Sequence, residues 1–127
     1  MNYVVLVILL ALVEYIVIVG LVGYARGKYG VAAPATTGHE AFERTFRVQQ
    51  NTLEGLVVFL PGLWLFGEYL NPTWAVWLGI AGIVGRAIYA VGYIKAADKR
   101  GFGAGIVGMV NIALVVGALV GVIESLL

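Results

Sequence analysis

Long apolar stretches constrain this chain more than any other feature of its sequence. The first begins at Tyr3 and continues to about residue 24 with Glu14 as its only charged residue. It is longer than the apolar core of a signal peptide, about 7 to 15 residues, and no charged segment precedes it. Because a bilayer core about 30 Å thick is crossed by about 20 helical residues, we expect a retained membrane-spanning helix over residues 3–24.

Three more spans are expected, over about residues 40–69, 73–97 and 102–126; the last two are apolar, whereas the first begins with a polar segment before it enters an apolar run. The chain has 127 residues, of which 61% are hydrophobic and 12% charged, far from the composition of a soluble domain. We therefore expect an all-α membrane protein, with residues 1–127 forming a single four-helix transmembrane domain.

Local signals suggest where these helices begin, bend and end. Thr37 to Glu40 has the spacing of a capping box, so the second helix should begin near residue 40. Pro61 predicts a kink in that helix, and Asn71-Pro72 a turn at its end. Gly117-x-x-x-Gly121 favours close helix packing in the last span.

The placement of charge is more informative than its sum. The formal net charge is +1, so no nucleic-acid surface is expected. Apart from Arg86, every Lys and Arg falls within or beside residues 25–47 or 95–101, whereas the termini and the Asn71-Pro72 turn carry none. By the positive-inside rule, both basic segments should face the cytoplasm and both termini the opposite side.

The most polar segment of the chain runs from Glu43 to Glu54 and leads directly into an apolar run. On a helix Arg47, Asn51 and Glu54 lie at positions i, i+4 and i+7, so a cation, an amide and a carboxylate share one stripe. Such a stripe suits a small zwitterion. The chain has no cysteine, so thiol chemistry here requires the thiol of a substrate.

Two ionisable residues, Glu14 and Arg86, lie within apolar stretches. An unpaired carboxylate in lipid costs at least about 2.5 kcal/mol, so such residues are functional candidates. For Glu14 the alternative is a protonated or paired carboxyl at a helix contact. Arg86 is a candidate partner, because it too needs a counter-charge or a wet cavity.

Arg86 also begins a series on the third span. Tyr89 and Tyr93 follow it at i+3 and i+7, and Arg100 comes seven residues after Tyr93. If the helix persists to Arg100, all four side chains share one face. Taken alone, Tyr93 and Arg100 are explained as well by an interfacial aromatic belt and a cytoplasmic loop charge.

Three segments together resemble a known family. Pro34-x-Thr36-Thr37-Gly38, Phe42-Glu43-Arg44 and the run from Phe46 to Glu54 are similar to the signature of the MAPEG superfamily, the membrane-associated proteins of eicosanoid and glutathione metabolism. The resemblance covers nearly the whole chain, nearest to the branch with microsomal glutathione transferase 2 and leukotriene C4 synthase.

The resemblance implies a left-handed up-down four-helix bundle assembled as a homotrimer, with sites at subunit interfaces near the cytoplasmic surface. It also implies a glutathione S-transferase, with glutathione as co-substrate and no metal. The second substrate would be a lipophilic electrophile taken from the membrane, in detoxification or eicosanoid metabolism. Glutathione peroxidase activity on lipid hydroperoxides is a further expectation. Two membranes are consistent with this expectation, a bacterial inner membrane and the endoplasmic reticulum, with the glutathione site facing the cytoplasm.

The same resemblance implies roles for individual residues. Arg100 would activate the thiol, and the glutathione-binding residues would be Arg26, Arg47, Gln49, Asn51, Glu54, Tyr89 and Tyr93. Elementary chemistry agrees, because guanidinium groups bind the two carboxylates of glutathione and a carboxylate binds its ammonium. The chain departs from leukotriene C4 synthase at two positions. That enzyme has an aromatic residue at the position of Gly55 and a second basic residue at the position of Gly27.

Two other functions are consistent with the sequence. One is a non-catalytic lipid-binding scaffold of the same superfamily, although such proteins lack the catalytic arginine that Arg100 matches. The other is a small four-helix multidrug transporter that uses Glu14 as its proton carrier. A transporter of that kind has no need of the polar cluster from Glu43 to Glu54.

Overall fold

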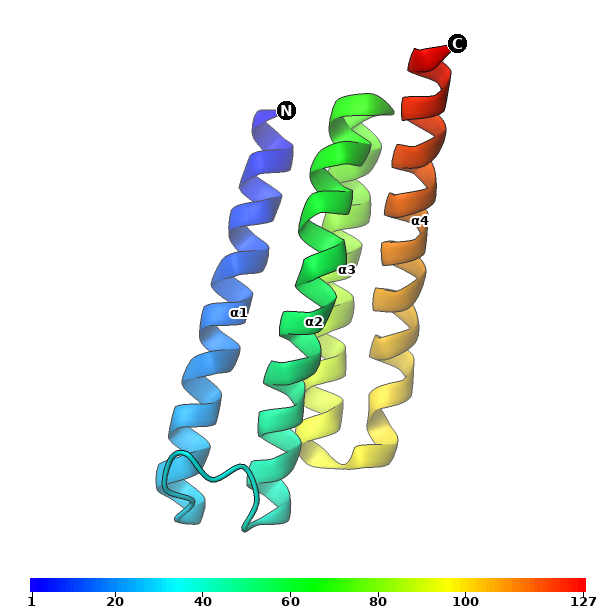
Figure 1. The fold of residues 1–127 in the computed structure, drawn as a ribbon. Coiled ribbons are helices and arrows are strands. Elements are labelled where there is room, and N and C mark those ends of the chain that lie inside the picture. Colours follow the sequence, from blue (N-terminus) through cyan, green and yellow to red (C-terminus); the bar gives the residue numbers. More distant parts are fainter.

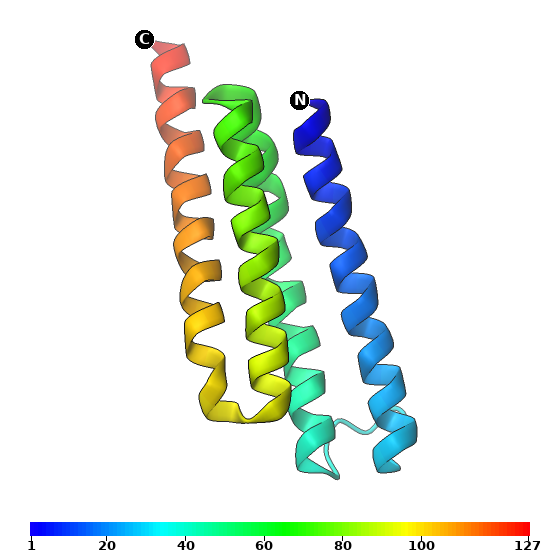
Figure 2. The same cartoon turned by 180° about the vertical axis from the view of Figure 1, so that it is seen from behind.

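The computed structural model describes all 127 residues as four long helices and one short 3-10 helix. The helices lie side by side in an up-down bundle, with both termini and the α2–α3 turn at one end (Figure 1). Seen from behind, α1 and α4 flank the central pair α2 and α3 (Figure 2). The elements are α1 (Asn2–Tyr29), α2 (Glu40–Tyr69), α3 (Pro72–Lys95), η1 (Ala97–Arg100) and α4 (Gly101–Leu126). The prediction of an all-helical chain with four long helices is confirmed.

Three of these helical segments are long and apolar enough to cross a membrane: Asn2–Tyr29, Pro72–Lys95 and Ala97–Leu126. The remaining expected span, the second in the chain over residues 40–69, forms helix α2 but is not among these three. Its N-terminal half carries the charged residues Glu40, Glu43, Arg44, Arg47 and Glu54, which lower its hydropathy. Even so, α2 runs beside the other helices along the bundle (Figure 1).

The first helix is longer than the sequence predicts. It ends at Tyr29 rather than near residue 24. The next residue, Gly30, adopts a left-handed conformation (φ 68°), and its N–H donates to the carbonyl of Arg26. Arg26 and Lys28 therefore lie on the last turn of α1, where cations oppose the negative end of the helix dipole. The expected loop over residues 25–38 is correspondingly shorter.

The start of α2 agrees with the prediction, but the capping residue does not. His39, not Thr37, is the N-cap, and its Nδ1 accepts a hydrogen bond from the Ala41 N–H (3.1 Å). Glu43 reaches back to accept from the Gly38 N–H (3.2 Å), so a carboxylate still neutralises the start of the helix. At the other end, Asn71 caps α3 as a turn residue, accepting from the Trp74 N–H (3.0 Å).

The connection from α3 to α4 differs most from the expectation. The third helix ends at Lys95 because Ala96 is extended (φ −163°, ψ 140°), and η1 then leads into α4. The helix therefore does not persist to Arg100, and the proposed continuous face from Arg86 to Arg100 is wrong.

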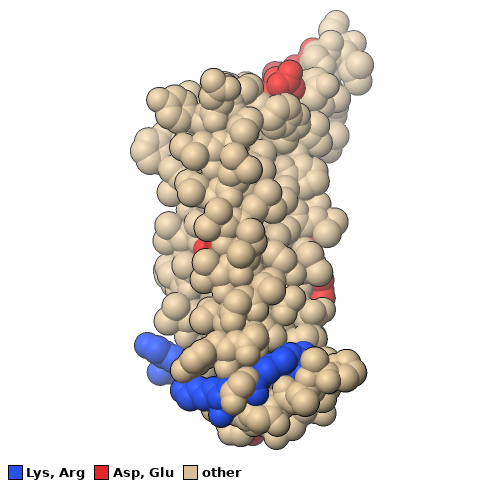
Figure 3. Space-filling model, turned by 90° about the vertical axis from the view of Figure 1, so that its left-hand side faces the viewer, with Lys and Arg blue, Asp and Glu red and all other residues tan.

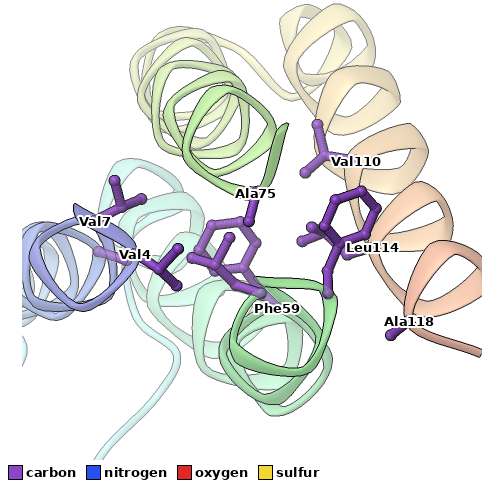
Figure 4. Close-up of a cluster of buried hydrophobic side chains, with 10 residues drawn as sticks. Val4, Val7, Phe59, Ala75, Val110, Leu114 and Ala118 are labelled. Carbon is purple, nitrogen blue, oxygen red and sulfur yellow. The ribbon is translucent and has the colours of Figure 1, made fainter. Parts of the chain in front are cut away.

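The core of the bundle is apolar and glycine-rich. Ten buried side chains from all four helices form one cluster, which Figure 4 shows around Phe59 and Leu114. Helix α4 packs closely on α2 at Gly117 and Gly121, where an added Cβ would collide with the Phe66 ring and the Tyr69 carbonyl. The predicted role of the GxxxG motif is thus confirmed within the chain.

Candidate functional site

The candidate site lies at the end of the bundle that holds the loop after α1 and the α3–α4 connection, which we call the basic end. Figure 3 shows Lys and Arg gathered at this end, whereas the middle of the same face is almost uncharged. The clustering follows from the lengths of the helices, which bring two basic segments distant in sequence to one end. Its basic residues are Arg26, Lys28, Arg44, Arg47, Lys95, Lys99 and Arg100.

A polar hollow of about 280 Å³ opens between α2, α3 and η1 at the basic end. Its lining residues carry both signs of charge and one phenol: Glu40, Glu43, Arg44, Arg47, Tyr93 and Ala97. Arg44 also joins two elements, because its Nε donates to the Ile94 carbonyl in the last turn of α3 (3.2 Å).

Arg100 does not line this hollow, but it lies against Tyr93, which does. The break at Ala96 turns the chain, and the Arg100 guanidinium lies over the Tyr93 ring, 5.5 Å from its centroid. Its Nη1 donates to the Ala97 carbonyl (2.7 Å), which fixes the side chain against η1. Arg100 is exposed, so its remaining donors are free for a ligand.

Tyr89 lies deeper and is almost wholly buried, with 3% of its surface exposed. Its hydroxyl is hydrogen-bonded to the side-chain amide of Asn51 on α2, and its ring packs edge-on against Tyr93 (5.6 Å between centroids). The predicted tyrosines and the predicted amide are thus in contact. They connect the hollow to the interior of the bundle.

Arg47 and Glu54 share the stripe of Asn51 but point away from the core. Both are exposed, and neither is hydrogen-bonded within the chain. Glu54 lies halfway along α2, where an outward carboxylate is unusual for a helix of such a bundle. The stripe was correctly predicted, and the structure adds that its charged ends face outward.

Arg26 and Gln49 lie on a different side from the other candidates. Gln49 is turned about 160° from Arg47 around the helix, and its Nε2 donates to the Tyr15 hydroxyl on α1 (3.3 Å). Arg26 donates to the Ala35 carbonyl (2.7 Å) and lies over the Phe42 ring (4.8 Å), holding the loop after α1. One copy of the chain therefore does not bring all the predicted binding residues together.

Glu14 and Arg86 line one small cavity inside the bundle, together with Thr52 and Gly55 of α2. No ion pair within 4.0 Å joins them, and the cavity of about 20 Å³ has room for about one water molecule. An added Cβ at Gly55 would collide with the Arg86 guanidinium, so this glycine makes room for it. Arg86 also lies over the Tyr89 ring (5.1 Å), which links the cavity to the candidate site.

Sequence reasoning missed three residues of the hollow: Glu40, Glu43 and Arg44. They precede Arg47 by seven, four and three residues, so helical spacing alone would have placed them on the same stripe. No group of three His, Asp or Glu side chains gathers as a metal site.

Comparison with known proteins identifies the family. Residues 4–120 match the MAPEG family. The chain belongs to the MAPEG family. One relative of this MAPEG protein is an uncharacterized protein from Synechocystis sp. The two are 52% identical over 121 residues, which make up 95% of this chain and 88% of that protein.

Two named groups of relatives follow. Microsomal glutathione S-transferase 2 from Bos taurus is 42% identical over 107 residues, 84% of this chain and 73% of that protein. The Homo sapiens protein of that name is 49% identical over 79 residues, 62% of this chain and 54% of its own length. Leukotriene C4 synthase from Cavia porcellus is 37% identical over 76 residues, 60% of this chain and 51% of that protein. With the membrane-spanning helices, the family makes the chain an integral membrane protein.

Proposed function

We propose that this MAPEG protein is a glutathione S-transferase that binds glutathione at the basic end and joins it to a lipophilic electrophile. The observation that carries the proposal is the position of Arg100. Its guanidinium lies over Tyr93, which lines a hollow together with Arg47 and two carboxylates. The relatives named as glutathione transferases support the same activity.

The binding chemistry follows from the charges of glutathione, which has two carboxylates and one ammonium. Arg47, with Arg26 and Gln49, would bind the carboxylates through charge-assisted hydrogen bonds. Glu54 would bind the ammonium, helped by the Asn51 amide. Tyr89 and Tyr93 would line the peptide between them.

The chemical step requires the thiolate, because an ordinary thiol with a pKa of about 8.5 is mostly protonated at neutral pH. A fixed cation beside the sulfur favours the charged form. Arg100 would supply this cation, and the proton would leave to water. The thiolate sulfur then forms a bond to the electrophilic carbon, which releases its leaving group with the bonding electron pair.

An assembly of several copies would complete the site. A single copy leaves Glu54 outward in the middle of α2, where hydrocarbon would surround a carboxylate at a cost of at least about 2.5 kcal/mol. A neighbouring copy that covers this stripe with the side bearing Arg26 and Gln49 would remove that cost and unite the two groups. Contacts between two different faces form a ring when the rotation between copies closes, and we propose the closed homotrimer that the resemblance implies.

In such an assembly α2 would also cross the membrane, as the fourth span. The basic end would face the cytoplasm, since Lys and Arg accumulate on the side that is not translocated. Glutathione would then enter from the cytoplasm and the electrophile from the lipid. Because the chain has no cysteine, this can be tested by labelling single cysteines introduced at Thr36, in the loop between α1 and α2, and at Thr73, in the first turn of α3.

The test of the activity is conjugation of glutathione to a chlorinated nitrobenzene by the purified, folded protein. Arg47→Ala should lower the rate at limiting glutathione, whereas Lys28→Ala should not. Lys28 is a matched control, because it is an exposed cation at the same end whose ammonium lies over Tyr29 rather than the hollow. Absence of conjugation by the folded parent, with lipid still bound, would instead favour the non-catalytic scaffold.

A further inference from the structure

A second hollow at the basic end lies on the outer side of α3, away from the candidate glutathione site. It measures about 480 Å³. Its lining is cationic at the basic end and apolar toward the middle of the bundle, and consists of Ala87, Ile88, Val91, Gly92, Lys95 and Lys99. None of these residues belongs to the site proposed for glutathione. The hollow therefore needs its own explanation.

The hollow is built by the same chain break that positions Arg100. Extended Ala96 turns the chain so that η1 folds back on α3, and the Lys99 carbonyl approaches Gly92. A Cβ at Gly92 would collide with that carbonyl, so the close approach depends on glycine. The fold places the Lys99 side chain on the same hollow as Lys95, although one lies on η1 and the other on α3.

An apolar track continues from the hollow along the outer face of α3. Ile88 and Val91 are exposed, and Val84 and Ile80 continue the same stripe at helical spacing toward the other end of the bundle. Since α3 is long and apolar enough to cross a membrane, the track has the chemistry and the length that suit an acyl chain.

The two lysines at the basic end of the track, Lys95 and Lys99, make no hydrogen bond or ion pair through their side chains. Asp98 precedes Lys99 but does not line the hollow. Lys28, in contrast, has its ammonium near the rings of Tyr24 and Tyr29.

We propose that this hollow binds one anionic glycerophospholipid. Lys95 and Lys99 hold its phosphate, and one acyl chain lies along Val91 and Ile88. Charge complementarity selects the anionic headgroup, because each Lys near the membrane surface contributes about a fivefold gain in affinity for acidic lipid. The bound lipid also secures η1, which carries Arg100, against α3. A role of the lipid in positioning Arg100 for thiol activation rests on the proposed function, whereas the binding of the lipid does not.

The test uses the full-length protein in bilayer discs of equal parts phosphatidylglycerol and phosphatidylcholine. The lipid retained by the released protein is measured by native mass spectrometry, which also counts protein copies. The parent should retain phosphatidylglycerol preferentially, and Lys95→Gln with Lys99→Gln should remove the preference. Val91→Trp, which fills the track without changing charge, should lower retention of both lipids, whereas Lys28→Gln should change nothing.

Equal retention of the two lipids by the parent would overturn the proposal. It would also be overturned if Lys28→Gln removed the preference for phosphatidylglycerol as much as the change of Lys95 and Lys99 does, because the attraction would then be to the basic end in general. Unchanged retention in Val91→Trp, with all copies joined in a larger complex, would show that another copy covers the hollow. Conjugation activity is measured separately with and without phosphatidylglycerol. Lipid retention without any conjugation would leave this site standing and contradict only the transferase.

Discussion

Arg100 is the residue whose removal tests the proposed chemistry most sharply. The Arg100→Ala change removes the guanidinium beside Tyr93 without disturbing the core, because the side chain is exposed and its one hydrogen bond is to η1 itself. Glutathione should still bind, through the α2 stripe. What should change is the pKa of the bound thiol.

The magnitude follows from simple titration. A shift of about two units, worth roughly 2.7 kcal/mol, would place the bound thiol at about 6.5 in the parent and about 8.5 in Arg100→Ala. At pH 6.5 the thiolate fraction would then fall from about 50% to about 1%, and at pH 9 from nearly all to about three quarters. The variant should therefore be most deficient at low pH and recover as the pH rises.

The assay is the ultraviolet absorbance of bound thiolate, titrated from pH 5 to pH 10 in parent and variant. Absorbance counts thiolate directly, whereas rates also reflect nucleophilicity, which falls as the thiol becomes more acidic, with a Brønsted slope of about 0.4–0.5. Turnover of Arg100→Ala at pH 6.5 should therefore drop by only about 5- to 8-fold, because the higher nucleophilicity of the less acidic thiolate offsets part of the roughly 50-fold loss of thiolate. Arg100→Lys, which keeps the charge, should retain most of the shift. Coincident titration curves for parent and Arg100→Ala would refute the assigned role.

Three further predictions concern the bundle and its interior. Gly117→Leu should lower the free energy of unfolding by about 1–3 kcal/mol, because the new side chain meets the Phe66 ring. Gly105→Ala should not lower it, because Gly105 faces open space. Equal melting temperatures for Gly117→Leu and the parent would contradict this prediction. Arg86→Met and Glu14→Gln should be coupled by about 0.5–3 kcal/mol in a double-mutant cycle, since they share one cavity; simple additivity would show independent residues. Arg86→Met should also raise the KM for glutathione through Tyr89, and an unchanged KM with lowered stability would limit Arg86 to a structural role.

Periodicity predicted those parts of the site that lie on one helix. The stripe of Arg47, Asn51 and Glu54 required only 3.6 residues per turn. Apolar runs long enough for a bilayer predicted three of the helices, and the start signal near residue 40 predicted the start of α2. The same helical spacing could have added Glu40 and Glu43 to the stripe. These features are local, so one sequence contains them.

The features that depend on chain breaks and on neighbours were not predictable in this way. Nothing in the sequence around Ala96 marks an extended residue, yet this break brings Arg100 over Tyr93 and builds the second hollow. The opposite placement of Gln49 follows from its position on the helix, but its partner Tyr15 requires the packing of α1 on α2. Helix contacts of this kind are set by side-chain fit across the bundle, which sequence spacing does not encode.

The proposed function depends on recognition of glutathione by the basic end. Calorimetric titration of glutathione into the purified protein in lipid discs measures this recognition directly. We expect saturable binding by the parent, a clearly weaker affinity in Arg47→Ala and an unchanged affinity in Lys28→Ala. No heat of binding to a protein shown to be folded, or the same affinity in the parent and Arg47→Ala, would contradict the proposed site.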